Sequence, residues 1–301
     1  MKVCFVYSNR AEKSILSAFI QYFKKKSSIT TLDLSTRIKN INDNRNLSEI
    51  YTRCYKLFSS QKYDYVCVLG DRRELPFVSL ATFYSNTKLV HIAAGEYIES
   101  LTTYDQYVRP IVSILSDYQI CLSNNAKKEV IKLFDGIPYL KHNAKNFGNP
   151  IFRGINLKTL KKPYKASYDL VLLHPQSLSR YETQQDVKQL EKYLKNKKTI
   201  FISGNKDKNF DLIEKFYQKL KLLKREYVFV DSLTKLDYFR MIKFCDRFFT
   251  NSSSVSEIKY LNKHCLREIG KRNKNRTNME FNDKAPELLF KLLKESQSSS
   301  V

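Results

Sequence analysis

Four groups of polar and charged residues in this sequence have the composition of a site that binds an anion and moves protons. Each group comes directly after a short apolar run, at residues 8–14, 70–74, 91–96 and 251–257. The first group begins Ser8-Asn9-Arg10. Because Ser and Asn cap helices and Arg carries a guanidinium, a helix that starts here would make an anion site. The alternative is a plain capped turn with a surface arginine.

The second and third groups carry the residues that could transfer protons. Asp71 follows a strongly apolar run, and a carboxylate at the end of a buried strand can act as a base or orient one. The third group contains His91 and Glu96, and Asp105 and Arg109 follow it closely. The alternatives are an N-cap role for Asp71 and mutual neutralisation of the charges around His91.

The fourth group is rich in hydroxyls. Asn251, Ser252 and Ser253 come after an apolar run and open an expected helix that contains Glu257. Hydroxyls and free backbone N–H groups at a helix start suit a diphosphate, and Glu257 could accept bonds from ribose hydroxyls. Arg272 follows the next apolar run and could close on the same phosphates with charge-assisted bonds. A serine-rich N-cap is the alternative.

These groups need a scaffold that brings strand ends together, and the rest of the sequence predicts one. Short apolar runs alternate with amphipathic stretches, which indicates mostly parallel sheets covered on both faces. In such sheets the carboxyl ends of the strands face the ligand. We expect strands at 2–8, 29–35, 63–70, 88–92, 118–122, 169–174, 199–204, 227–230, 247–250 and 265–270. We expect helices near 11–26, 46–58, 73–85, 105–116, 183–195, 208–223, 234–243, 254–262 and 285–295.

The alternation pauses once, at residues 148–168, which are rich in Pro, Gly and Lys and have no strong period. We place a domain boundary there. The prediction is an α/β protein with two Rossmann-like, doubly wound parallel-sheet domains and a ligand cleft between them. The domains would comprise residues 1–155 and 156–283, followed by a C-terminal helix at 284–296 and a tail at 297–301.

Composition narrows the class of protein further. The chain has 301 residues, of which 42% are hydrophobic, and no apolar run is long enough to span a membrane or to form a signal peptide. Six scattered cysteines without a Cys-x-x-Cys pair predict small buried side chains in a reducing compartment and no zinc site. We therefore expect a cytoplasmic protein. Neither a G-x-G-x-x-G nor a P-loop motif is present, so no dinucleotide cofactor is expected.

The formal net charge of +23 favours anionic partners such as phosphates. The lysines are spread along the chain and no nucleic-acid motif accompanies them, so solvated helices explain most of them and nucleic acid is not expected.

Taken together and in this order, the charged groups resemble the UDP-N-acetylglucosamine 2-epimerase family, and most closely its hydrolysing branch. The resemblance runs from about residue 2 to about residue 277, with gaps, and implies the GT-B fold. The matching segments are Asn9-Arg10-Ala11-Glu12, Gly70-Asp71-Arg72-x-Glu74, His91-Ile92-x-x-Gly95-Glu96 with Asp105 and Arg109, Gly148-Asn149-Pro150, His174-Pro175, Asn251-Ser252-Ser253 with Glu257, and Gly270-x-Arg272.

The resemblance implies roles by position. UDP would be held by Arg10, Asn251, Ser252, Ser253, Glu257 and Arg272. His174 would face the pyrophosphate or the sugar, and Asp71, His91, Asp105 and Arg109 would line the sugar end. In this family UDP leaves by elimination across C1–C2, and water or UDP then adds back with inversion at C2. The product would be an N-acetylmannosamine-type sugar for sialic-type or surface-glycan synthesis, made without cofactor or metal.

Three departures from the family's pattern fall at the proton-transfer positions. The family usually has a carboxylate where this chain has Ala93 and Gln106, and a lysine where it has Ile15. Glu96 and Glu99 are the expected substitutes. The alternatives are a GT-B glycosyltransferase, which the positive charge would help dock on an anionic membrane, and a non-catalytic UDP-sugar-binding homologue. Assembly into homo-oligomers is a further expectation from the resemblance.

Overall fold

The computed structural model describes residues 1–37, 46–137, 139–204, 206–223 and 225–298. The chain forms two compact units. Unit 1 comprises Met1–Tyr97, Tyr104–Gly154 and the residues from Thr277 onward, and unit 2 comprises Ile98–Thr103 and Ile155–Arg276. The short segment Ile98–Thr103 thus belongs to unit 2, although the chain on both sides of it belongs to unit 1.

Unit 1 is built on a six-stranded sheet in which every pair of neighbours is parallel, in the order β2-β1-β3-β4-β5-β6. Its strands are β1 Lys2–Tyr7, β2 Ser28–Asp33, β3 Tyr65–Leu69, β4 Lys88–Ile92, β5 Tyr118–Cys121 and β6 Ala144–Asn146. Its helices are α1 Arg10–Lys24, α2 Leu34–Arg37, α3 Leu47–Gln61, α4 Leu75–Tyr84, α5 Asp105–Ile114, α6 Asn124–Asp135 and α11 Ala285–Ser298.

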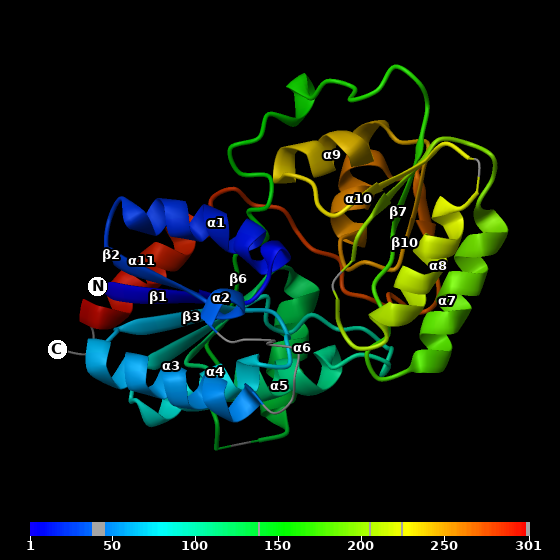
Figure 1. The fold of residues 1–301 in the computed structure, drawn as a ribbon. Coiled ribbons are helices and arrows are strands. Elements are labelled where there is room, and N and C mark those ends of the chain that lie inside the picture. Colours follow the sequence, from blue (N-terminus) through cyan, green and yellow to red (C-terminus); the bar gives the residue numbers. More distant parts are fainter. Residues whose placement is uncertain (38–45, 138, 205, 224, 299–301) are drawn as a thin grey trace. The chain divides into compact units, whose positions relative to one another are not determined.

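The strands β1 and β3 of unit 1 are largely apolar because both faces of the sheet are covered. On β1, Phe5 and its alternate neighbours pack in the core beneath α1 and α11, whereas Val6 faces the core beneath α3 and α4. Figure 1 shows α1 and α11 side by side on one face of this sheet and α3, α4 and α5 on the other. The C-terminal helix is therefore part of unit 1, where the Arg153 guanidinium holds the Glu287 carboxylate through two bonds of 2.6 and 2.7 Å.

Unit 2 contains a five-stranded parallel sheet in the order β11-β10-β7-β8-β9. Its strands are β7 Asp169–Leu172, β8 Thr199–Ile202, β9 Tyr227–Val230, β10 Arg247–Thr250 and β11 Leu266–Glu268. Its α-helices are α7 Arg180–Tyr193, α8 Phe210–Lys221, α9 Lys235–Phe244 and α10 Val255–Asn262, and a 3₁₀ turn spans Leu157–Thr159. Helices α7 and α8 cover one face, and α9 and α10 lie together on the other (Figure 1).

The predicted α/β class with two doubly wound parallel sheets is confirmed. The predicted strands and helices recur within a few residues, and the structure adds α2, α6 and the short strand β6, which the sequence analysis did not predict. All six cysteines are buried. In the part of the chain that is described, no helix has the length and apolar character needed to cross a bilayer.

The strand order places one topological switch point in each sheet. In unit 1 the chain runs from β1 outward to β2 and then returns to β3 on the other side of β1. In unit 2 it runs from β7 to β8 and β9 and then returns to β10 on the other side of β7. Open α/β sheets bind ligands beyond the carboxyl ends of the strands at such points. The turns after β1, β3, β7 and β10 are therefore the places to look for a site.

Candidate functional site

The turn after β1 in unit 1 is a complete helix N-cap. The side chain of Asn9 accepts a hydrogen bond of 2.9 Å from the backbone N–H of Glu12, and the Glu12 carboxylate accepts bonds from the backbone N–H groups of Ser8 and Asn9 at 2.7 and 3.3 Å. This reciprocal capping box fixes the start of α1. Arg10 is the first residue of the helix, and its side chain lies outside the part of the structure that is described.

Glu12 is more than a cap, because its carboxyl is buried next to a second buried carboxyl. Burial and the neighbouring Glu74 raise the pKa of Glu12 to about 7, while Arg72 and the bonds from Ser8 lower it in part. Burial disfavours the charged form of a carboxyl, and a like charge nearby does the same. The sequence analysis gave Glu12 no role. Its position three residues after Asn9 was the signal for the capping box.

This raised pKa predicts how the stability of unit 1 varies with pH. The folded protein keeps a proton on Glu12 that the unfolded chain loses near pH 4.5, so its contribution is full below pH 4.5 and is lost as pH rises through about 7. We expect wild-type unit 1 to lose stability between about pH 4.5 and 7, and Glu12→Gln to remove about 1–3 kcal/mol of that loss. Thermal unfolding of both proteins across this pH range measures the difference, and equal slopes would contradict it. Glu49→Gln, an exposed carboxylate on α3, is the control.

The turn after β3 holds a carboxylate–guanidinium pair. Asp71 forms an ion pair with Arg109 of α5, and the other terminal nitrogen of Arg109 donates to the backbone carbonyl of Glu96. The Arg109 side chain is 5% exposed and that of Asp71 is 21% exposed. The structure thus brings together three predicted site residues, two from the turns after β3 and β4 and one from α5. The buried guanidinium fixes the orientation of the Asp71 carboxylate, which keeps some access to solvent.

His91, near the end of β4, is fully buried and both of its ring nitrogens are engaged. Nε2 lies 2.7 Å from the carbonyl oxygen of Gly70, and Nδ1 lies 2.9 Å from the hydroxyl of Ser113. Because a carbonyl only accepts, Nε2 carries the proton and Nδ1 accepts from the hydroxyl. Burial lowers the pKa of His91 to about 4, so the ring is neutral near pH 7. This geometry favours a role in holding the strand ends together and does not favour proton transfer to a substrate.

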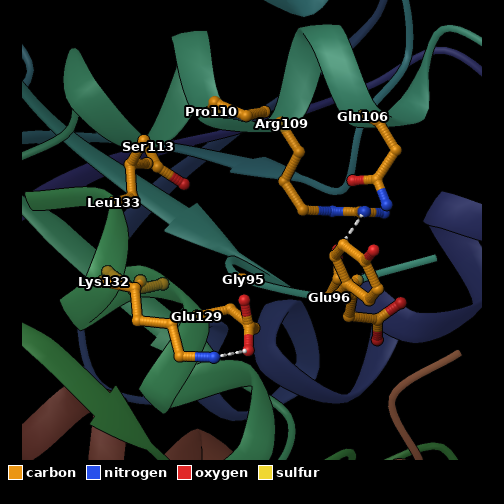
Figure 2. A pocket seen from close by; sticks show the side chains of 11 residues that line it. Gly95, Glu96, Gln106, Arg109, Pro110, Ser113, Glu129, Lys132 and Leu133 are labelled. Carbon is orange, nitrogen blue, oxygen red and sulfur yellow. Dashed lines mark hydrogen bonds and ion pairs between the residues drawn. The ribbon is translucent and has the colours of Figure 1, made fainter. Parts of the chain in front are cut away.

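A pocket of about 260 Å³ lies in unit 1 between α5, α6 and the turn after β4 (Figure 2). Arg109, Glu96 and Ser113 contribute to its wall, and Lys132 and Glu129 of α6 form an ion pair of 2.7 Å at its side. Sites for complete drug-sized ligands are usually larger than roughly 300 Å³. The pocket therefore suits one sugar ring or an acyl group and is too small for a whole nucleotide sugar.

Of the three residues that depart from the family's pattern, two pack in or against the core of unit 1 and one lines the pocket. Ala93 is 5% exposed, packs in the core of unit 1 and has a backbone φ of 62°. Ile15 packs against the same core, whereas the ammonium of Lys13 lies over the ring of Tyr7. Gln106 lines the pocket one residue after Asp105, which starts α5. A core alanine and a core isoleucine leave no acid or base at two of the expected places.

Glu99 is unsuited to replace the missing carboxylates of unit 1. It lies in the segment that belongs to unit 2, where its carboxylate pairs with Lys274 at 2.5 Å and accepts from the amide of Asn275 at 2.5 Å. These bonds, with that from Lys274 the larger, lower the pKa of Glu99. Of the two expected substitutes, Glu96 remains, and its side chain is buried in the same turn that receives Arg109.

In unit 2, one asparagine connects the chain after β7 to the chain after β10, the two strands at the switch point. The carboxamide oxygen of Asn251, just after β10, accepts from the backbone N–H of His174 at 2.8 Å, and its NH₂ group donates to the His174 carbonyl at 2.8 Å. Asn251 has no exposed surface. His174, after β7, and Asn251, after β10, are therefore held side by side. The imidazole of His174 is half-buried at this point.

The hydroxyl-rich turn after Asn251 is compact and partly exposed. The backbone N–H of Ser252 donates to Thr250, and the Ser254 hydroxyl donates to the Ser252 hydroxyl at 3.0 Å. Ser252 and Glu257 are buried, whereas Ser253 is exposed at the start of α10. Arg272 follows β11 and lines a pocket of about 200 Å³ together with Lys271 and Lys274. A helix start, hydroxyls and cations on neighbouring strand ends are suited to a diphosphate.

Sequence reasoning missed Asp186, a carboxylate on α7 that is 2% exposed. Its Oδ2 atom accepts bonds of 2.9 Å from the amides of both Gln176 and Asn251. Burial raises its pKa to about 6, and the two amide bonds lower it in part. The available signal was an acidic residue on the apolar face of α7, between Thr183 and Leu190, which are buried beside it.

With the geometry described, comparison with known proteins identifies the family. The family model described as UDP-N-acetylglucosamine 2-epimerase matches residues 11–281. The chain belongs to this family. The match covers most of both units and includes every predicted site residue except Arg10.

Two curated relatives and one solved structure in this family are similar to the chain. The polysialic acid biosynthesis protein P7 of Escherichia coli is 32% identical over 73% of this chain and 58% of its own length. The GDP/UDP-N,N'-diacetylbacillosamine 2-epimerase (hydrolyzing) of Campylobacter jejuni is 28% identical over 77% of this chain and 62% of its own length. The chain spans about three-fifths of the length of these relatives.

The solved structure gives the fold. The UDP-GlcNAc 2-epimerase of Methanocaldococcus jannaschii, crystallised with UDP-GlcNAc and UDP, has a TM-score of 0.76 at 17% identity and covers 98% of this chain and 100% of its own. The epimerase-type GT-B fold expected from the sequence is thereby shown.

Proposed function

We propose that this protein is a hydrolysing 2-epimerase of UDP-sugars. The observation that carries the proposal is the division of chemistry between the two switch points. The turns of unit 2 gather a helix start, hydroxyls and cations, which suit a diphosphate, and unit 1 holds an oriented carboxylate beside a guanidinium. Because the chain belongs to the epimerase family, we infer that UDP is eliminated first and that water adds afterwards.

In this proposal unit 2 binds the nucleotide part. The backbone at the start of α10 and the hydroxyls of Ser252 and Ser253 would receive the diphosphate, and Arg272 would neutralise its charge. Glu257, one turn into α10, would accept bonds from the ribose hydroxyls. As the bond from the sugar C1 to the diphosphate oxygen breaks, the electron pair stays on UDP, and these donors stabilise the developing charge.

Unit 1 would handle the protons. We propose that Asp71 takes the proton from C2 while UDP leaves, so that a double bond forms between C1 and C2. A second group then returns a proton to the opposite face of C2 as water adds at C1. We propose Asp105 or Glu96 for this second step, because Asp105 begins the helix that carries Arg109 and the backbone carbonyl of Glu96 accepts from Arg109. Such positioned proton transfers usually contribute roughly 10²–10⁴-fold in rate.

The names of the relatives support both the substrate class and the context. One of them acts on N,N'-diacetylbacillosamine linked to GDP or UDP, and the other serves polysialic acid biosynthesis. The product we propose is an N-acetylmannosamine-type sugar for a sialic-type acid or another surface glycan. No nicotinamide or metal takes part in the steps described. Assembly into a homo-oligomer and contact with an anionic membrane remain predictions from the sequence.

A panel of nucleotide sugars tests the proposal. The purified chain is incubated with UDP-N-acetylglucosamine, UDP-N,N'-diacetylbacillosamine and the matching GDP-sugars, and free nucleotide and sugar are separated and identified. We expect release of UDP together with a sugar whose configuration at C2 is inverted. Release of UDP together with a sugar that keeps its configuration at C2 would contradict epimerisation and would indicate simple hydrolysis or transfer.

The buried Ala93 and the partly buried Ile15 favour a second candidate, a UDP-sugar-binding homologue without C2 chemistry. The same panel separates the two functions when UDP binding is measured by calorimetry. Saturable binding of UDP with no turnover of any nucleotide sugar would establish the binder and reject the epimerase.

A further inference from the structure

Three consecutive strand ends in unit 2 converge on one buried carboxylate. The turns after β11, β10 and β7 are neighbours in the sheet and contain Gly270, Asn251 and Gln176 in that order. All three contact Asp186 on α7, which lies beneath them. Three of the residues that we assign to UDP binding, Ser252, Ser253 and Arg272, lie in the turns after β10 and β11.

The contacts of Asp186 are hydrogen bonds on one oxygen and close packing on the other. Oδ2 accepts from the amide groups of Gln176 and Asn251, each at 2.9 Å. Oδ1 lies against the Cα of Gly270, so a Cβ built there would sit only 1.9 Å from it. Gly270 also has a φ of 66°, and its backbone N–H donates to Gln189 of the same helix at 2.8 Å. Helix α7 thus holds the turn after β11 as well.

The bond to Asn251 has the larger consequence for the site. Asn251 uses its remaining hydrogen and its oxygen on the backbone of His174, so its orientation decides how the ends of β7 and β10 meet. Without an acceptor at Asp186, one amide hydrogen of Asn251 would be buried without a partner, which is unfavourable. The carboxamide would then turn or move, and Ser252 and Ser253 would move with it.

A buried ionised carboxylate is itself costly, which argues that it serves a purpose other than stability. Glu182 on α7 and Arg272 after β11 are the charged groups that influence Asp186, with opposite signs. An apolar residue here would avoid that cost but would leave the buried amides of Gln176 and Asn251 without their acceptor. We therefore infer that the acid is retained because it holds the amides of Gln176 and Asn251 in one orientation.

We propose that Asp186 is a positioning residue of the nucleotide site. It orders the turns that carry His174, Asn251 and Ser252 and does not touch the ligand. The proposal rests on the proposed function for the identity of the ligand, and on the contacts above for the ordering of the turns.

Calorimetric titration with UDP and hydrogen exchange of the ligand-free protein test it together. In Asp186→Leu we expect the Kd for UDP to rise at least about tenfold, which corresponds to the loss of one such bond. The backbone amide of His174 and those of residues 252–254 should exchange faster. Asp186→Asn keeps an acceptor, so its Kd should stay within about threefold of the wild type. Glu191→Gln, an exposed acid on the same helix, is the matched control.

Each other outcome counts against the proposal in a defined way. Unchanged exchange and unchanged UDP affinity in Asp186→Leu would overturn it, and an equal loss in Asp186→Asn would assign the effect to charge instead of position. If Asp186→Leu does not fold, Gly270→Ala replaces it, because the added Cβ displaces the carboxylate from Asn251. Should the wild type not bind UDP, the proposed function fails, whereas the exchange of His174 still decides whether Asp186 orders the turns.

Discussion

Replacing Asp71 by asparagine is expected to lower turnover of the nucleotide sugar by about 10²–10⁴-fold while leaving the Kd for UDP within about threefold. The reason is chemical. An amide cannot take the C2 proton, and the proposed nucleotide site belongs to unit 2, whereas Asp71 belongs to unit 1. Steady-state release of UDP and calorimetric titration with UDP measure the two quantities separately.

The ion pair with Arg109 sets the control for this experiment. Arg109 is buried, so removing the charge of Asp71 also weakens the fold around α5. Asp71→Glu keeps the charge and a proton acceptor but moves it by one methylene, and it should keep part of the activity. If Asp71→Asn and Asp71→Glu lose the same small amount, Asp71 supports the structure and the proton acceptor must be sought elsewhere, first at Asp105 and Glu96.

Arg272→Ala is expected to raise the Kd for UDP by roughly 30–100-fold, or about 2–3 kcal/mol. Arg272 is half-buried after β11, beside the turns that we assign to the diphosphate, and its charge acts on the buried Asp186. A guanidinium at such a place can form two charge-assisted bonds with phosphate oxygens. The measurement is calorimetric titration with UDP at two salt concentrations.

A nearby arginine provides the matched control. Arg267 lies on β11, is exposed, and donates to backbone carbonyls of its own neighbourhood. Arg267→Ala removes a charge of the same sign from β11 itself, five residues before Arg272. A decrease in affinity that both substitutions share would therefore reflect only the general positive field. Equal effects of the two substitutions would contradict direct binding of the phosphates by Arg272.

The elements that could be predicted most closely from the sequence are the buried parallel strands. Residues 88–92, 227–230 and 247–250 form strands with the predicted bounds, because runs of β-branched and aromatic residues flanked by polar turns have few alternatives. The strand β6 was not predicted, since Ala144–Asn146 is short, half polar and at the edge of its sheet.

The site could be predicted only as a set of residue types at strand ends. Strand order is not written in local patterns, so the two switch points could not be foreseen, although the residues that occupy them were named. The role of Asp186 depends on Asn251, which is 65 residues away in the sequence. Likewise, the assignment of Glu99 to unit 2 depends on Lys274, 175 residues distant. Contacts of this kind exist only after folding.

Deuterium incorporation tests the central claim most directly. The protein is incubated with UDP-N-acetylglucosamine, or with the nucleotide sugar from the panel that releases UDP, in deuterated water, and the products are followed by proton NMR. The account predicts free UDP and an N-acetylmannosamine-type sugar that carries deuterium at C2, because the second group, which protonates the other face of C2, has exchanged its proton with the deuterated water. UDP resonances that broaden on binding while the C2 proton persists for a day would contradict it and leave a protein that binds UDP-sugars without acting on C2.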